Sequence, residues 1–465
     1  MVIQNRQSNF NWTVLSWEKC IQILYKLQKR LYKSIYVRDT KNSLLLQNLI
    51  LISNCSRLLA IREVTQISVN KKLSGVDGKT SLTFIERFEL NEFLKLNFNN
   101  WLPQSMKNVL SISKDGIINN LRISTISDRA WQALIRFSIE PAHEAIFHPH
   151  NFSFRLECSI YEIQKFFFIN LNKSACGIQK RILRINLMKL LFSFDHNSLI
   201  RKIIAPRSIK LGIFRSLKKG LLLGFFDNNS ESYCLSSLLS NILLDGVESI
   251  HNSLRFGSDI IYFLKPFDDE RIIIYKLKNF LLKIGITLKE KFVELFSTLK
   301  GFDFLGWHFK VYKNRNFIST PSYSNYQMFL KRVKHIINNS NYGALVKVNK
   351  LYPIIRDWKL YHKFSCLRGH RFSLFFLKKR AFKVFNKESR QDFYSSKRLL
   401  DKSFSFFLLE DKKVLLHNKF SSFYSGHLTF LIDFSILGLD NFYNSKNFLE
   451  NKYHCIHCGM KFTSN

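Results

Sequence analysis

The chain has 465 residues, of which 46% are apolar, enough for two or three domains with their own cores. It carries 71 Lys and Arg against 34 Asp and Glu, a formal net charge of +37. So large an excess of one sign opposes compaction unless nucleic acid or an anionic membrane supplies counter-charge. Because we find no uncharged apolar run of about 18 residues and no signal- or transit-peptide pattern at the N-terminus, we expect nucleic acid as the partner and no membrane.

Helical and strand patterns alternate along the chain up to about residue 310, which indicates an α/β or α+β domain. The elements predicted in its first half are, in chain order, helices over 12–35 and 44–61, a turn-rich loop over 68–79, a strand over 107–114 and a helix over 128–147. We expect the last of these helices to be interrupted near Pro141.

The amino-acid composition changes at residue 321. Residues 321–380 hold thirteen Lys and Arg but only one acidic residue, Asp357. The apolar side chains that share one face of a predicted helix in this region are Leu351, Ile354, Ile355, Trp358 and Tyr361. The opposite face is basic, so the sequence predicts a separate, mostly helical domain.

Six blocks of sequence lie in a fixed order over nearly the whole chain. They are LLAIREVTQ…GVDG (58–78), ISKDG…LRISTISDRAWQAL (112–134), IEPAHEAIF…NFSFR (139–155), SSLLSNILLDGVE (236–248), GFDFLGWHFKV (301–311) and VKHIINNSNYGALVKVNKLYPIIRDWKLYHKF (333–364). In this order they resemble the group II intron maturase family, above all its cyanobacterial and euglenoid-plastid members. That family joins a reverse transcriptase to a maturase domain called domain X.

The resemblance implies an α+β fold, with right-hand fingers and palm followed by the α-helical domain X. The division it implies is an N-terminal helical extension over 1–90, degenerate fingers and palm over 91–320, domain X over 321–420, and a truncated remnant of an HNH or zinc-type region over 421–465.

This sequence differs from the family at the residues that form the polymerase site. The family binds two metal ions with one Asp from a strand and two from an aromatic-x-Asp-Asp hairpin. In RINLMKLLFSFDH the strand position holds Asn186, and the family's second Asp of that block falls on Phe192. In the hairpin, Ser258 replaces the first Asp and only Asp259 survives. We therefore predict that the polymerase site is inactive.

A second acidic run, Phe267-Asp268-Asp269-Glu270, could be taken for the catalytic hairpin. The aromatic residue stands directly before the acidic pair, and a helix follows too soon, so we interpret the run as an acidic turn before a helix. The alternative is a residual reverse transcriptase that uses Asp259 with Asp195 or with this pair.

Other features of the polymerase and nuclease parts have also changed. The family's Pro-Gln-Gly-Gly loop corresponds to residues 230–233, which read Ser-Glu-Ser-Tyr. The glycines that would let the backbone approach a substrate closely are replaced there. Of the eight cysteines, only Cys455 and Cys458 lie close together, so a disulfide framework is not indicated. A closed zinc site needs four ligands, and we expect this orphan pair to bind no metal.

The RNA-binding residues that the resemblance and the charge pattern indicate combine cations with interleaved aromatic rings. They are Lys114, Arg155, Lys331, Arg332, Lys334, Lys350, Arg356, Lys359, Tyr361, His362, Lys363, Arg368 and Arg371, with Lys347 as a further cation. For Trp358 we favour core packing over RNA contact, and for Tyr361 and His362 both roles stay open.

The resemblance implies a splicing cofactor and not an enzyme: a maturase that binds a group II or group III intron in plastid pre-mRNA and assists its excision. The protein would need no cofactor of its own, because the Mg²⁺ belongs to the intron RNA. We also expect no small-molecule substrate. The protein would be located in the plastid and encoded there. A general RNA chaperone without a cognate intron is a further alternative.

Overall fold

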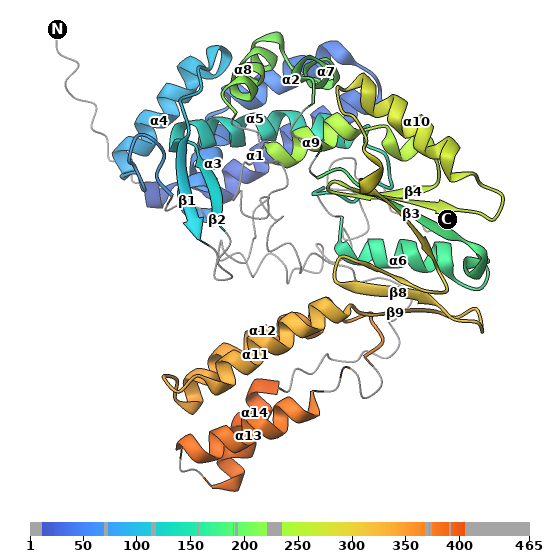
Figure 1. Cartoon of the computed structure of the whole chain (residues 1–465). Helices are drawn as coiled ribbons and strands as arrows, with labels where there is room; N and C mark the ends of the chain where they lie inside the picture. The colour runs from blue at the N-terminus through green and yellow to red at the C-terminus, as the bar shows by residue number, and fades with distance from the viewer. Residues whose placement is uncertain are drawn as a thin grey trace.

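The structure is a computed structural model. The parts of the chain that it describes are residues 12–68, 73–112, 118–155, 158–188, 190, 194–220, 235–367, 372, 374–389 and 392–404. Helices and small antiparallel sheets make up these parts, and the fold is α+β as predicted: a reverse-transcriptase-like body followed by a lobe of helices (Figure 1).

The N-terminal part of the body is helical. Its helices are α1 (Trp17–Tyr36), α2 (Thr40–Ile52), α3 (Asn54–Arg62), α4 (Phe84–Asn97) and α5 (Ile126–Glu144), with a π-helical turn over Glu63–Ile67. Helix α1 buries Ile21, Leu24 and Leu31, the apolar face on which its prediction depended. Helix α5 is buried along nearly its whole length, because the other helices pack around it.

The predicted helix over 44–61 is wrong in one respect: it is two helices. Ser53 adopts an extended backbone conformation that ends α2 and begins α3. The buried Arg57 guanidinium donates a hydrogen bond to the carbonyl of Ile52 that the break leaves free. No single helix in the described residues is long and apolar enough to cross a membrane, and by length and composition alone only the bent pair Thr40–Ile52 and Asn54–Ile67 passes.

The predicted interruption near Pro141 is also wrong, because α5 runs through this residue to Glu144. A proline inside a helix leaves the carbonyl four residues earlier without its N–H partner. Here that carbonyl belongs to Phe137, and the buried amide of Gln28 on α1 donates to it over 3.0 Å. Gln47 on α2 donates to the next carbonyl, that of Ser138, over 3.2 Å. Neighbouring helices thus supply the hydrogen bond that the proline removes.

The described residues form three antiparallel sheets. The strands are β1 (Lys107–Ile112), β2 (Ile118–Ile123), β3 (Arg181–Asn186), β4 (Ser253–Phe256), β5 (Asp259–Leu264), β6 (Val293–Ser297), β7 (Phe302–Phe304), β8 (Trp307–Val311) and β9 (Phe317–Pro321). Strands β1 and β2 form a hairpin, the central sheet has the order β4-β5-β3-β6, and the last sheet has the order β7-β8-β9. The helices among them are α6 (Ile160–Leu171), α7 (His196–Lys202), α8 (Arg207–Lys218), α9 (Ser236–Leu244) and α10 (Glu270–Lys283).

The central sheet is buried on both faces. Leu183, Ile185 and Tyr262 point into the large core that the N-terminal helices share with α9 and α10. Ile182 and Phe263 point to the other side, into a second core built by α6 and the strands β7 to β9. Strand positions alternate between these faces, so residues 182, 184 and 186 of β3 lie on the side of the second core.

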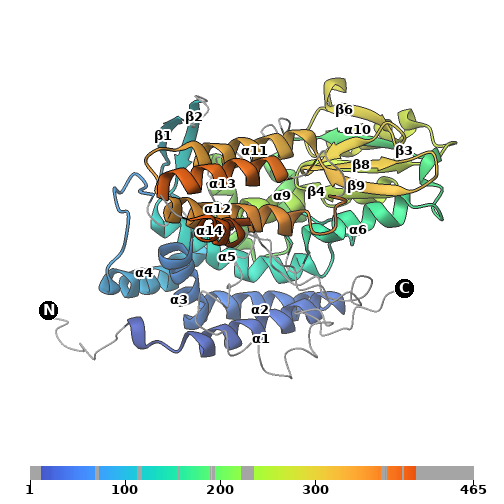
Figure 2. The ribbon, with the colours of Figure 1, turned by 90° about the horizontal axis from the view of Figure 1, so that it is seen from below.

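The C-terminal lobe consists of α11 (Tyr323–Asn338), α12 (Ala344–Tyr361), α13 (Phe375–Ser389) and α14 (Phe393–Phe404). Viewed from below, these helices run side by side as one bundle (Figure 2). They enclose a core of their own, to which Phe329, Val333, Leu351 and Phe385 contribute. Trp358 belongs to this core, in agreement with the prediction of core packing.

The end of α12 connects the lobe to the body. The Tyr361 ring stacks on Trp307 of β8 at 4.8 Å between centroids, and its hydroxyl donates to the carbonyl of Leu305. Tyr161 of α6 donates to the carbonyl of Leu360 over 2.6 Å. Cys366, just beyond α12, donates its backbone N–H to Ser319 over 2.7 Å. These contacts fix the direction in which the lobe leaves the body.

Candidate functional site

The two sequence blocks that correspond to the family's polymerase centre meet in the central sheet. In the pairing of β3 with β5, Asn186 lies directly opposite Asp259. The Asn186 side-chain amide donates to Asp259 Oδ1 over 3.0 Å. The backbone N–H of Leu187 donates to the Ser258 carbonyl over 2.9 Å, and Ser258 is buried at the turn of the hairpin. Asn186, Ser258 and Asp259 are therefore neighbours in space.

A fourth side chain completes this cluster, and it is a cation. Arg184 lies two residues before Asn186 on the same face of β3, and its Nε donates to the same Asp259 oxygen over 3.1 Å. Its Nη1 also lies 3.7 Å from a carboxylate oxygen of Glu294 on β6. Burial raises the pKa of the Asp259 carboxyl, and the neighbouring guanidinium opposes that shift.

Asp259 is the carboxylate at the centre of the cluster, with Glu294 on the other side of Arg184, and Asp259 already accepts hydrogen bonds from a guanidinium and an amide. Divalent cations such as Mg²⁺ need several oxygen ligands of their own. Over the parts of the chain that the structure describes, no group of three or more His, Cys, Asp or Glu side chains is placed to hold a metal ion.

The hairpin that carries Ser258 and Asp259 is held by a buried ion pair. Arg255 of β4 donates to Glu248 over 2.5 Å, and both side chains are fully buried. A second guanidinium nitrogen of Arg255 donates to the Asn241 side chain over 3.0 Å. Removing one partner of a buried pair is strongly destabilising, so we expect this hairpin to need both Arg255 and Glu248.

The other carboxylates considered for catalysis have structural roles. Asp269 is the N-cap of α10 and accepts from the backbone N–H of Arg271, while Asp268 accepts from the Lys265 backbone over 2.7 Å. Both follow the far end of β5 from Asp259, as expected for an acidic turn before a helix. Asp195 is the N-cap of α7.

The predicted RNA-binding cations of the C-terminal lobe fall into two groups. Those with exposed side chains are Lys331, Arg332 and Lys334 on α11, Lys350 on α12, and Lys363 just after α12. Arg356 is half-exposed, with its guanidinium 2.8 Å from the carboxylate of its neighbour Asp357. These side chains present positive charge to solvent.

The remaining predicted contacts are engaged within the protein. Arg155 bonds both oxygens of Glu144 and is nearly buried. The Lys347 side chain is fully buried. Lys359 donates to the Phe404 carbonyl over 2.7 Å, which ties α12 to α14.

Of the two aromatic residues whose role the sequence left open, His362 is buried and Tyr361 is part-buried. His362 has no exposed surface and lies 3.1 Å from Asn325 Oδ1, and burial lowers its pKa to about 4. Tyr361 belongs to the junction with β8, where burial raises the pKa of its phenol. Both side chains pack against other parts of the protein.

Several predicted residues lie outside the described parts of the chain, namely Lys114, Arg368, Arg371, Cys455, Cys458, Phe192 and the loop 230–233. Sequence reasoning also missed two features. The first is Arg184, which period-two spacing places on the same strand face as Asn186. The second is a further set of exposed cations on α13 and α14: Lys378, Lys379, Arg380, Lys383, Lys387, Lys397, Arg398 and Lys402.

Comparison with known proteins agrees with the fold. A family model described as the N-terminal domain of reverse transcriptase matches residues 12–94. Maturase-like protein 1 of Euglena gracilis is 51% identical over 450 residues, which are 96% of this chain and 96% of that protein. Maturase-like protein 1 of Euglena longa is 47% identical over 453 residues, 96% of this chain and 97% of that protein. The chain belongs to the family of group II intron maturases.

Proposed function

We propose that this maturase binds intron RNA, assists the excision of a group II or group III intron from plastid pre-mRNA, and has neither reverse transcriptase nor endonuclease activity. The proposal includes the division of the chain into an extension (1–90), fingers and palm (91–320), domain X (321–420) and a nuclease remnant (421–465). The intron's own metal ions perform the transesterifications, and the protein stabilises the RNA fold in which they act.

The observation that carries the loss of polymerase activity is the contact of Arg184 and Asn186 with Asp259. Two-metal catalysis needs negative charge that holds two cations about 4 Å apart. A guanidinium held between Asp259 and Glu294 supplies positive charge where those cations would bind. The cluster therefore favours a structural role over catalysis.

The RNA-binding part of the proposal depends on the exposed cations of α11, α13 and α14. Lys and Arg that neutralise phosphates release counterions, and this supplies most of the sequence-independent affinity for RNA. A bundle with its own core presents these cations on rigid helices, which holds their spacing fixed relative to an RNA backbone.

Splicing of candidate plastid introns in vitro at low Mg²⁺, with and without the full-length protein, tests the proposal. The informative variant changes Lys331, Arg332 and Lys334 to Ala, since all three are exposed on α11. A matched control removes the same charge from the body by changing the exposed Lys276, Lys283 and Lys289 to Ala. We expect the wild type and the control to accelerate excision of one intron and the α11 variant to lose most of this effect.

Two results would contradict the proposal in different ways. If no intron responds and the protein extends a primer on a homopolymer template in a divalent-dependent manner, the residual polymerase is the correct interpretation. If the protein binds its intron and bulk RNA equally, and both complexes dissociate together as salt is raised, it is a general RNA chaperone.

A further inference from the structure

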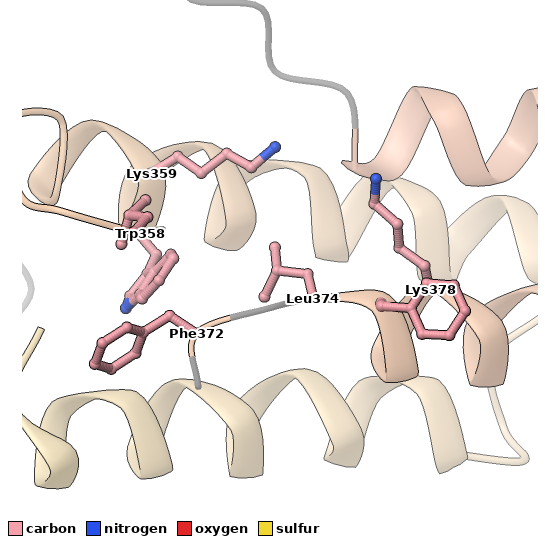
Figure 3. Close-up of a pocket in the computed structure, with 7 residues that line it drawn as sticks. Trp358, Lys359, Phe372, Leu374 and Lys378 are labelled. Atoms are coloured by element: carbon pink, nitrogen blue, oxygen red, sulfur yellow. The ribbon is translucent and has the colours of Figure 1, made fainter. Parts of the chain in front are cut away.

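A cavity of about 340 Å³ opens between α12 and α13 in the helical lobe (Figure 3). Its lining combines apolar and cationic side chains: Trp358, Lys359, Leu367, Phe372, Leu374, Phe375 and Lys378. Its volume falls in the range of about 300–1,000 Å³ that is usual for small-ligand sites.

The walls of the cavity are held by the core of the lobe. Trp358 is stacked on Phe329 at 4.5 Å between ring centroids, and its indole N–H donates to Asn325. Phe372 meets the Tyr326 ring edge-on at 5.3 Å. These contacts hold the Trp358 and Phe372 rings against the core of the lobe.

The charged side chains among the described lining residues are Lys359 and Lys378. Lys359 donates one N–H to the Phe404 carbonyl, and an ammonium group has two more to offer a ligand. Figure 3 shows the ammonium groups of Lys359 and Lys378 on the same side of the cavity, above Phe372 and Leu374 in that view. Burial lowers the pKa of Lys359, and the charge of Lys378 lowers it further. No carboxylate is among the lining residues that the structure describes. Two like charges beside an apolar cavity favour a ligand that brings an anionic group to its rim.

We propose that this cavity receives a single unpaired nucleotide of the bound RNA, with its base between the apolar walls and its phosphate at Lys359 and Lys378. An unpaired base presents a flat aromatic face that stacks on aromatic side chains, and its phosphate carries the charge that the two lysines lack. The inference rests on the proposed RNA-binding function and adds that the lobe captures one extruded base, besides contacting the backbone.

The test uses the full-length protein and two RNA hairpins that differ at one position. The first has a single bulged uridine in its stem, and the second has an abasic residue at that bulge. Backbone charge is the same in both RNAs, so contacts to phosphate alone cannot distinguish them. We expect the wild type to bind the uridine bulge about tenfold more tightly than the abasic bulge, as for one stacked base.

Two substitutions of the cavity walls should abolish this preference while overall RNA affinity is largely kept. Leu374→Trp fills the cavity, and Phe372→Ala removes one aromatic wall. Lys378→Ala should weaken binding of both hairpins and reduce the slope of log affinity against log salt by about one. Its matched control is Lys387→Ala, which lies nine residues further on α13 and therefore about two and a half turns away, on the opposite face.

The outcomes distinguish a failure of the cavity proposal from a failure of the proposed RNA-binding function. If the wild type binds both hairpins equally, the cavity proposal is wrong and RNA binding stands. If the preference for uridine survives in both wall variants, the base is bound elsewhere and the cavity proposal is again wrong. If the wild type binds neither hairpin more tightly than it binds a neutral polymer, the proposed function itself fails.

Discussion

The side-chain amide of Asn186 lies 3.0 Å from Asp259 Oδ1, across the pairing of β3 with β5. An amide can donate to a carboxylate, whereas a second carboxylate at this distance would repel it unless a cation or a shared proton lay between them. Asn186 therefore stabilises the hairpin without a metal ion. Arg184 adds a full positive charge on the same oxygen, so the cluster is satisfied by the protein alone.

The first prediction concerns the coupling between Arg184 and Asp259. Arg184→Gln removes the guanidinium from a carboxylate that is largely buried, and we expect it to destabilise the protein by about 1–3 kcal/mol. The double variant with Asp259→Asn should lose less stability than the sum of the two single variants, because no carboxylate is left at position 259 to need a cation. The midpoint of urea unfolding measures the stability of each variant.

The control is Arg201→Gln, which breaks an exposed pair with 4.0 Å between its charged atoms. We expect it to change stability by less than about 0.5 kcal/mol. Strict additivity of the two changes would show that the pair is not coupled.

The second prediction concerns metal binding at the same cluster. Restoring carboxylates with Asn186→Asp and Ser258→Asp should create at most a weak Mn²⁺ site, because Arg184 still occupies Asp259. Adding Arg184→Ala to that double variant removes the competing cation, and we expect Mn²⁺ to bind at least tenfold more tightly than it binds the double variant. Calorimetric titration with Mn²⁺ measures both, with the wild type as the reference. Equal affinities in the presence and absence of Arg184 would show that the guanidinium does not compete with a metal ion.

The sequence was sufficient to predict the α+β fold and the helical lobe, because block order and apolar periodicity survive in this chain. It could not predict that α5 runs through Pro141, because the compensating amides of Gln28 and Gln47 come from other helices. Nor could it decide between core and surface for Tyr361, because the stacking partner, Trp307, is distant in the chain. The blocks placed Asn186 and Asp259 in matching positions of the family pattern, but only the strand register shows that they touch.

The third prediction separates a junction residue from an RNA contact. Tyr361→Phe removes only the hydroxyl that bonds the Leu305 carbonyl, so it should leave RNA affinity within about twofold while it loosens the connection between lobe and body. Limited proteolysis should then cut faster at the end of α12, where the lobe joins the body. Lys363→Ala, at an exposed position two residues away, should do the opposite: it should weaken RNA binding and leave the proteolysis rate unchanged. A tenfold loss of RNA affinity in Tyr361→Phe would restore this residue to the RNA-binding surface.

The fourth prediction concerns the pH dependence of stability that His362 confers. Its Nε2 lies 3.1 Å from Asn325 Oδ1, and because an amide oxygen only accepts, Nε2 carries a proton. Burial lowers its pKa from 6.5 to about 4 in the folded protein. Between pH 6.5 and about pH 4 the imidazole is protonated in the unfolded chain but not in the folded protein. The contribution of this residue to the free energy of unfolding therefore falls as the pH drops through this range.

The variant His362→Gln isolates that contribution. It should be less stable than the wild type at pH 7, and the difference should shrink toward pH 4 by up to about 1.4 kcal/mol per pH unit, because the variant has no imidazole to protonate on unfolding. Urea unfolding of both proteins at pH 7, 6 and 5 measures the difference, and other titrating groups cancel in it. His335→Gln, at an exposed position on α11, controls for the loss of an imidazole and should change stability by less than about 0.5 kcal/mol at pH 7. A difference between wild type and His362→Gln that stays constant over this range would mean that the ring takes up its proton without leaving the fold, and His362 would then be accessible enough to contact RNA after all.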